Sequence, residues 1–257
     1  NKLRECTSKG YFYIDGEKEN FPEYKQVINH DFYNFTGIHR DVIVYSLPKK
    51  GIEDVIIKTV VGGDYKKVNV KTVTKGKVIK YTVSDGETVV CVSKTGDITI
   101  ENPVLWSCEN PHLYTLTVET ENDCYKQRFG IRKVSYDDKG LYLNDKPVYL
   151  KGFGKHEDFF VSGKGNNSAV NVRDFELLKW INANSIRTSH YPYAEEIYDL
   201  ADSYGILVID EVPAVGINHW GEYTFGEGGA DEKTLALHKD LLSLLWERDK
   251  NHPCVVM

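Results

Sequence analysis

Two neighbouring stretches decide the fold class of this chain. They are Ser185-Ile186-Arg187-Thr188-Ser189-His190-Tyr191-Pro192-Tyr193-Ala194-Glu195-Glu196 and Tyr204-Gly205-Ile206-Leu207-Val208-Ile209-Asp210-Glu211. The first reads as an apolar strand, a polar cluster at its end, a proline-set turn and the start of a helix. The second reads as a helix end at Gly205 and an apolar strand that finishes in two carboxylates. This order predicts a parallel sheet, and a (β/α) barrel places its chemistry at the C-terminal strand ends.

The same alternation extends through the last part of the chain. Strands are expected at about 148–154, 185–190, 206–211 and 254–257, with helices at 171–183, 194–204 and 234–249. We interpret residues 138–257 as the N-terminal half of a TIM (β/α)8 barrel. Val255 and Val256 should form a fully buried parallel strand. The open edge beside it would need cover from the rest of the barrel or from self-association.

Earlier residues have the short period of β-structure. Between about residues 51 and 136, β-branched runs recur with glycine-containing turns between them, which is typical of an immunoglobulin-like sandwich, here assigned to 49–137. Residues 1–48 are strand-like and aromatic, with strands expected at 11–14 and 41–45. These strands are too few to make a stable domain alone, so we interpret them as the C-terminal part of a further β-sandwich.

Composition excludes several classes of function. The net charge of −6 with interspersed lysines and acids gives no basic footprint for nucleic acid, and no apolar run is long enough for a membrane span. The five cysteines lack the spacing of a disulfide framework or a zinc site. Neither a signal peptide nor a starting methionine is present, so the sequence predicts reduced thiols in the cytoplasm.

Several residues are candidates for a site from their positions alone. Asp210 and Glu211 are an adjacent acidic pair at a strand end, which is a place for acid/base chemistry. Arg187 within a barrel strand should be a buried charge that needs a partner. His156, Glu157 and Asp158 are consecutive and point in different directions, which disfavours a metal site there.

The loop at 218–233 holds three aromatic residues among glycines. It leaves the same face of the predicted barrel, and a loop of this length without helix or strand periodicity is usually functional or disordered. Its aromatic side chains could stack on a sugar or an aglycone, or could anchor the loop to its own domain; they are Trp220, Tyr223 and Phe225.

Five motifs resemble β-glucuronidases of glycoside hydrolase family 2, in the same order along nearly the whole chain. They are Asn29 to Arg40, Gly152-Phe153-Gly154-Lys155-His156-Glu157-Asp158, Arg187 to Glu196, Ile209-Asp210-Glu211, and Arg248-Asp249-Lys250-Asn251-His252-Pro253. The barrel motifs fit any member of the family. The first two motifs are specifically similar to those of glucuronidases.

The resemblance implies a jelly-roll sugar-binding domain for residues 1–48, and a retaining, cofactor-free hydrolase that acts on β-D-glucuronides as a homo-oligomer. By matched position, Asp31 and His190 bind the sugar. The residues implied to support the pocket are Arg187, His156, Glu157, Asp210 and Glu211. The resemblance therefore demotes Asp210 and Glu211 from acid/base work to support.

One departure from the family is large. The family's acid/base and nucleophilic glutamates match positions beyond Met257, so the chain should position the sugar without cleaving the bond. Two alternatives remain open at this stage. One is a β-galactosidase or galacturonidase of the same family, and the other is a non-catalytic carbohydrate-binding or scaffold protein.

Overall fold

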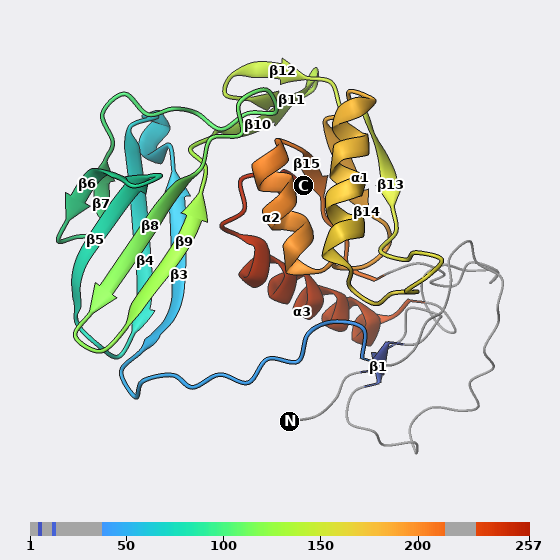
Figure 1. The fold of residues 1–257 in the computed structure, drawn as a ribbon, viewed down its shortest axis with the longest axis horizontal. Helices are drawn as coiled ribbons and strands as arrows, with labels where there is room; N and C mark the ends of the chain where they lie inside the picture. The colour runs from blue at the N-terminus through green and yellow to red at the C-terminus, as the bar shows by residue number, and fades with distance from the viewer. Residues whose placement is uncertain (1–4, 7–11, 14–37, 214–229) are drawn as a thin grey trace.

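The structure is a computed structural model that describes residues 5–6, 12–13, 38–213 and 230–257 (Figure 1). Asp31 and the aromatic residues of the 218–233 loop lie outside the described residues. Before residue 38, only β1 (Glu5–Cys6) and β2 (Phe12–Tyr13) are described, and they pair antiparallel. None of the helices in the described ranges has the length and apolar character that spanning a membrane would require.

Residues 52–129 form a sandwich of two antiparallel sheets. One sheet has the strand order β3-β4-β7 and the other β6-β5-β8-β9. Side chains from both sheets, among them Val55, Val83 and Leu116, share one buried core. The strands are β3 (Ile52–Thr59), β4 (Lys67–Thr74), β5 (Val78–Asp85), β6 (Thr88–Ser93), β7 (Asp97–Thr99), β8 (Tyr114–Thr120) and β9 (Cys124–Phe129), with a short 3-10 turn at Val61–Gly63.

Alternating burial explains why these segments form strands. In β8, Tyr114, Leu116 and Val118 are buried while the residues between them are half-buried, which is the period of two that places one strand face in a core. The strands expected between residues 55 and 119 are confirmed. Strand β9 was not expected, because most of its side chains are polar and its exposed face gives no apolar alternation.

The strand expected at residues 41–45 is not formed. Residues 41–47 have no regular secondary structure, and Val42, Val44 and Tyr45 are 74%, 94% and 75% exposed. A strand is stabilised by its ladder partner, and among the described residues no strand pairs with this segment. The β-branched residues therefore favour a strand, but they do not form one without a partner strand.

A three-stranded antiparallel sheet connects the sandwich to the rest of the chain (Figure 1). Its strands are β10 (Val134–Asp137), β11 (Gly140–Leu143) and β12 (Lys146–Val148). Asn144 and Asp145 close the second turn with φ values of 52° and 63°, a two-residue hairpin for which asparagine and aspartate are suited. The Asn144 side chain also donates to the carbonyl of Trp106, which fixes the connecting sheet to the sandwich exit.

The last part of the chain alternates parallel strands with helices, as predicted. The sheet has the order β13-β14-β15, and its elements are β13 (Gly152–Lys155), α1 (Ser168–Trp180), β14 (Ser185–Thr188), α2 (Glu195–Tyr204), β15 (Leu207–Ile209) and α3 (Glu232–Asp249). Asn167 caps α1 by accepting from the Val170 amide. Gly205 ends α2 at φ 70°, where an added Cβ would lie 2.5 Å from the Cys108 carbonyl oxygen.

The fourth expected strand is present only in part. Val255 forms an isolated parallel bridge with Val208, and the Asp210 amide donates to the Met257 carbonyl. Val255 and Val256 are half-buried, so the expectation of full burial is wrong for the described residues. The reason is that the described sheet places a neighbour on one side of this segment only.

Long-range hydrogen bonds fasten the sandwich to the barrel segment. The buried indole of Trp106 donates to the Asp202 carbonyl at 2.8 Å, at the end of α2. Asn251, just after α3, accepts from the Ile57 amide and donates to the Val55 carbonyl in β3. These contacts set the direction in which the barrel strands point.

Candidate functional site

The C-terminal ends of β13, β14 and β15 bring four of the expected site residues together. Because the three strands are parallel and in register, the residues that follow them emerge at one edge of the sheet. His156 follows β13, Arg187 and His190 lie at the end of β14, and Glu211 follows β15. The sequence predicted this edge as the site, and the structure places these side chains there.

Glu211 joins two of these groups. Its Oε1 lies 3.2 Å from Nε of Arg187, and its Oε2 lies 3.2 Å from Nδ1 of His190. A carboxylate that contacts one edge of an imidazole fixes the ring orientation and turns the Nε2 edge away from it. The side chains of Glu211 and His190 are 26% and 21% exposed, so the pair is accessible from solvent.

A second histidine lies against this pair. The rings of His156 and His190 are 5.6 Å apart between centroids and meet edge to face, and the His156 ring is 6.3 Å from that of Tyr191. Edge-to-face aromatic contacts favour defined ring positions. His156 therefore lies beside the sugar-binding candidate His190, as the sequence predicted.

The expected burial of Arg187 is wrong. Its side chain is 46% exposed, and its partners are Glu211 and the hydroxyl of Ser189, 3.3 Å from Nε and from the terminal nitrogen. It is an ion-paired arginine that lines an open face. The partner that the sequence calls for is Glu211, which supplies the opposite charge.

Glu157 points to a different part of the structure. Its carboxylate accepts from Arg40 at 2.6 Å and from the Ala194 amide at 2.5 Å, at the start of α2. Arg40 also donates to the Pro192 carbonyl at 2.6 Å. The remaining space there is about 10 Å³, room for a water molecule and not for a sugar. Glu157 thus ties the segment around residue 40 to the barrel loops, a contact that the sequence did not predict.

Asp210 is held below the open cluster. Its Oδ1 accepts from the Tyr198 hydroxyl at 2.7 Å and from the Thr188 hydroxyl at 3.1 Å, and its Oδ2 is buried. Burial and the neighbouring carboxylate of Asp249 raise the pKa of Asp210 to about 7, although the Tyr198 hydrogen bond acts to lower it. The Asp210 carboxyl therefore holds its proton to a higher pH than an exposed aspartate does.

Arg248 completes this buried group. It makes two hydrogen bonds of 2.7 Å to Asp249 and stacks 4.9 Å from the ring centre of Tyr198. The network links α2, α3 and β15 beneath the open face. From the sequence, Arg248 and Asp249 are recognised only as part of a motif. Nothing local in the sequence indicates that α3 packs beside Asp210.

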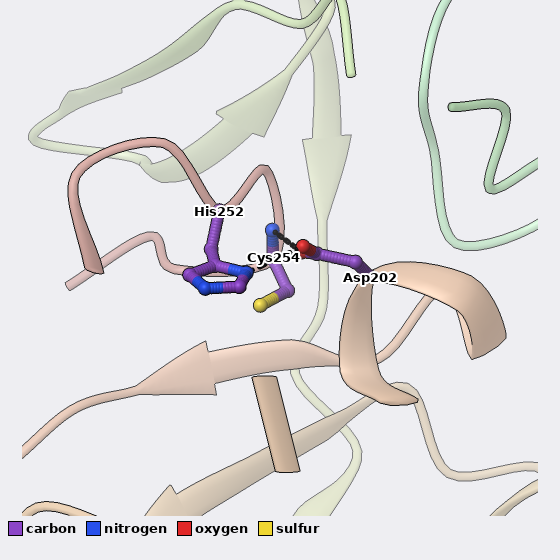
Figure 2. Close-up of side chains that lie close together, drawn as sticks. All are labelled: Asp202, His252 and Cys254. Atoms are coloured by element: carbon purple, nitrogen blue, oxygen red, sulfur yellow. Dashed lines mark hydrogen bonds and ion pairs between the residues drawn. The ribbon is translucent and has the colours of Figure 1, made fainter. Parts of the chain in front are cut away.

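One group of side chains among the described residues resembles a metal centre. Figure 2 shows Asp202, His252 and Cys254 close together, with candidate ligand atoms within 4.8 Å of one another. The Asp202 carboxylate already accepts from Nδ1 of His252 at 2.6 Å and from the Cys254 amide at 2.9 Å. Burial and Asp202 raise the pKa of the Cys254 thiol well above its usual value, whereas a metal needs the thiolate.

These hydrogen bonds therefore hold two segments of the chain together. Asp202 lies on α2, and His252 and Cys254 lie on the segment that follows α3. Burial acts to lower the pKa of His252, but the hydrogen bond and charge of Asp202 outweigh it and raise that pKa. A charged imidazole paired with a buried carboxylate joins the two segments.

Comparison with known proteins identifies similar sequences and structures. A family model described as glycosyl hydrolases family 2, TIM barrel domain, matches residues 133–257, and one described as glycosyl hydrolases family 2 matches residues 42–132. The β-glucuronidase of Paenibacillus borealis is 44% identical over 95% of this chain and 43% of its own length. The human β-glucuronidase is 36% identical over 88% of this chain and 37% of its own length.

Solved structures of β-glucuronidases are also similar to this chain. The β-D-glucuronidase of Dictyoglomus thermophilum matches with a TM-score of 0.83 and 44% identity, over 93% of this chain and 43% of that one. The β-glucuronidase of Ruminococcus gnavus, solved in complex with D-glucuronic acid, matches with a TM-score of 0.70 and 39% identity, over 81% and 36% of the two chains. The chain thus spans less than half the length of these relatives.

Proposed function

The chain belongs to glycosyl hydrolase family 2, a family of glycosidases, and on that premise we propose that it forms part of an enzyme that hydrolyses β-D-glucuronides. The observation that carries the proposal is the cluster of His190, Glu211, Arg187 and His156 at the C-terminal strand ends. A relative with the same fold was solved with D-glucuronic acid, which favours a uronic acid over a neutral sugar as the substrate.

His190 is the sugar-contacting residue in this proposal. Glu211 holds the ring through Nδ1, and the Nε2 edge is the proposed contact to a sugar hydroxyl above the strand ends. Arg187 compensates the charge of Glu211 and keeps that carboxylate in place. His156 packs against the His190 ring and restricts its rotation.

The chain positions the sugar in this proposal, and other residues break the bond. Retaining glycosidases need two carboxyl groups about 5 to 5.5 Å apart, one to attack the anomeric carbon and one to protonate the leaving oxygen. Glu211 is engaged by Arg187 and His190, while Asp210 is turned toward Tyr198 and Thr188. By resemblance, both catalytic glutamates belong to sequence beyond Met257.

Asp31 is proposed as a second sugar contact, reaching from the jelly-roll domain. Arg40, nine residues further along, is fixed to Glu157 and Pro192 on the barrel loops, and the Asn166 amide donates to the His39 carbonyl. These contacts place residues 39 and 40 beside the barrel loops. Trp220, Tyr223 and Phe225 are proposed to stack on the sugar or aglycone, or to anchor their own loop.

Exposed apolar side chains support a proposal that further sequence packs on the barrel segment. The large apolar residues exposed on its strands and helices are Phe153, Val172, Leu177, Trp180, Leu235, Leu242, Leu244 and Trp246. Large exposed apolar areas mark surfaces that are covered in the whole protein. We propose that the remaining strands of the barrel cover it, within an immunoglobulin-like and jelly-roll framework and a homo-oligomeric enzyme.

The substrate is tested with a panel of chromogenic glycosides. The whole enzyme should hydrolyse the 4-nitrophenyl β-D-glucuronide with a far higher kcat/KM than the matching β-galactoside and β-galacturonide. Residues 1–257 alone should hydrolyse none of them, because losing either catalytic carboxylate removes several powers of ten in rate. A preference for the galactoside or galacturonide would assign the chain to the rival activity. Turnover by the purified chain that Glu211→Gln abolishes would make Glu211 catalytic.

A further inference from the structure

A groove of about 380 Å³ lies at the junction between the sandwich and the barrel segment. Its walls are the end of β3, the connection after β9 and the turn after α3. His252 and Pro253 precede the segment that runs beside β15, so the groove opens at the N-terminal end of the barrel strands. It therefore lies at the opposite end of the strands from His190 and Glu211.

The lining of the groove is basic. Five of its residues carry basic side chains and none is acidic; the five are Lys58, Arg132, Lys133, Lys250 and His252. Three of these have acidic partners outside the groove lining, in the pairs Lys133 with Asp145 at 2.6 Å, Lys250 with Asp54 at 2.9 Å, and His252 with Asp202 at 2.6 Å. The other two basic residues, Arg132 and Lys58, form no ion pair with the described residues.

Arg132 is a cation whose hydrogen-bond partners are neutral. Its Nε donates to the Pro253 carbonyl at 2.6 Å and a terminal nitrogen donates to the Val255 carbonyl at 2.7 Å. No carboxylate of the described residues forms an ion pair with it, and burial lowers its pKa from the ordinary value. Asp202 acts on it only from a distance and is already bonded to His252.

Lys58 faces the same groove from β3 and, within the part of the chain that is described, also has no ion-pair partner. A desolvated guanidinium without a counter-charge is costly, and an anion beside it would recover part of that cost. A guanidinium fork with an ammonium group nearby suits the geometry of a phosphate or a carboxylate.

We propose that this groove binds a small anionic molecule through Arg132 and Lys58, with Lys133 at the rim. The ligand carries a phosphate or carboxylate group, and the volume leaves room for a body of about the size of a sugar. Such a ligand contacts the sandwich through Lys58 and, through Arg132, the connection that holds the carbonyls of residues 253 and 255. It therefore stabilises the junction between the two parts without occupying the glycosidase site.

The test is a titration of the whole enzyme with inorganic phosphate and, separately, with succinate, at fixed pH and at an ionic strength held constant with potassium chloride. Isothermal calorimetry should show saturable binding of at least one anion, and the same anion should raise Tm. The anion that binds more tightly shows whether the groove prefers a phosphate or a carboxylate.

Lys58→Gln is the decisive variant, because Lys58 is exposed and its loss should leave the fold intact. The dissociation constant should increase by roughly tenfold or more, the loss expected for one charge-assisted hydrogen bond. Lys94→Gln removes the same charge from the exposed turn between β6 and β7 and should leave binding unchanged. Absence of saturable binding by either anion, or equal affinity in Lys58→Gln and the unmodified enzyme, would overturn the proposal.

Discussion

Nδ1 of His190 lies 3.2 Å from Oε2 of Glu211, at the ends of two neighbouring parallel strands. The contact joins a residue just beyond β14 to one just beyond β15, so it depends on the register of the sheet and on no local sequence signal. It makes Glu211 the residue that orients the His190 ring in the proposed sugar site.

Replacing Glu211 with glutamine should weaken this orientation. Glutamine keeps the size of the side chain but loses the charge that pairs with Arg187, so kcat/KM for the glucuronide in the whole enzyme should fall roughly tenfold or more. KM should rise because sugar binding is weakened, and kcat should fall. The control is Glu176→Gln, which removes a carboxylate from the exposed face of α1, where it bonds to Tyr204. An unchanged kcat/KM in Glu211→Gln would show that His190 needs no such support.

The pair formed by Asp202 and His252 should stabilise the fold in a pH-dependent way. The folded-state pKa of His252 is raised above 6.5, so its contribution is complete below the unfolded value and is lost as pH rises through the folded value. Asp202→Asn should lower the free energy of unfolding by about 3 kcal/mol, because it leaves a buried partner uncompensated. It should also lower the pKa of His252, as measured by NMR with His238 on α3 as the internal reference. A His252 pKa that Asp202→Asn leaves unchanged would contradict the proposed pairing of Asp202 with His252.

Asp210 should give the stability the same sign of pH dependence, from a different cause. The pKa of Asp210 is about 7 in the folded state against an ordinary value of 3.8, so the folded state binds more protons between these limits. Stability from this group is therefore lost as pH rises from about 4 to 7, by up to about 1.4 kcal/mol per pH unit. Asp210→Asn should flatten that part of the stability profile in urea unfolding measured from pH 5 to 8. Asp138→Asn, in the exposed turn between β10 and β11, should leave the profile as it is.

Much of the fold could be predicted because local signals agree with it. The apolar run at 206–209 and the helix end at Gly205 mark β15 and the end of α2 where the structure has them. Strand β9 was missed because its exposed side chains are polar, and residues 41–45 were overassigned because strand propensity does not report a partner.

The candidate site could likewise be predicted only in part. Parallel strands bring their C-terminal ends together, so the meeting of His156, His190 and Glu211 follows from the topology alone. The ion pair of Arg40 with Glu157 spans 117 residues of sequence, and the position of Asp249 beside Asp210 depends on how α3 packs. Such contacts come from tertiary packing, which spacing in the sequence does not encode.

His190 is the residue on which the proposed glucuronide site depends most directly, and its role is tested by kcat/KM of the whole enzyme on a chromogenic β-D-glucuronide. Loss of a hydrogen bond to a sugar hydroxyl costs roughly 1 to 3 kcal/mol, so His190→Ala should lower kcat/KM by roughly tenfold to a hundredfold while Tm remains within a few degrees of the unmodified enzyme. A His190→Ala enzyme that folds and retains full kcat/KM would contradict the assignment of this strand end as the glucuronide site.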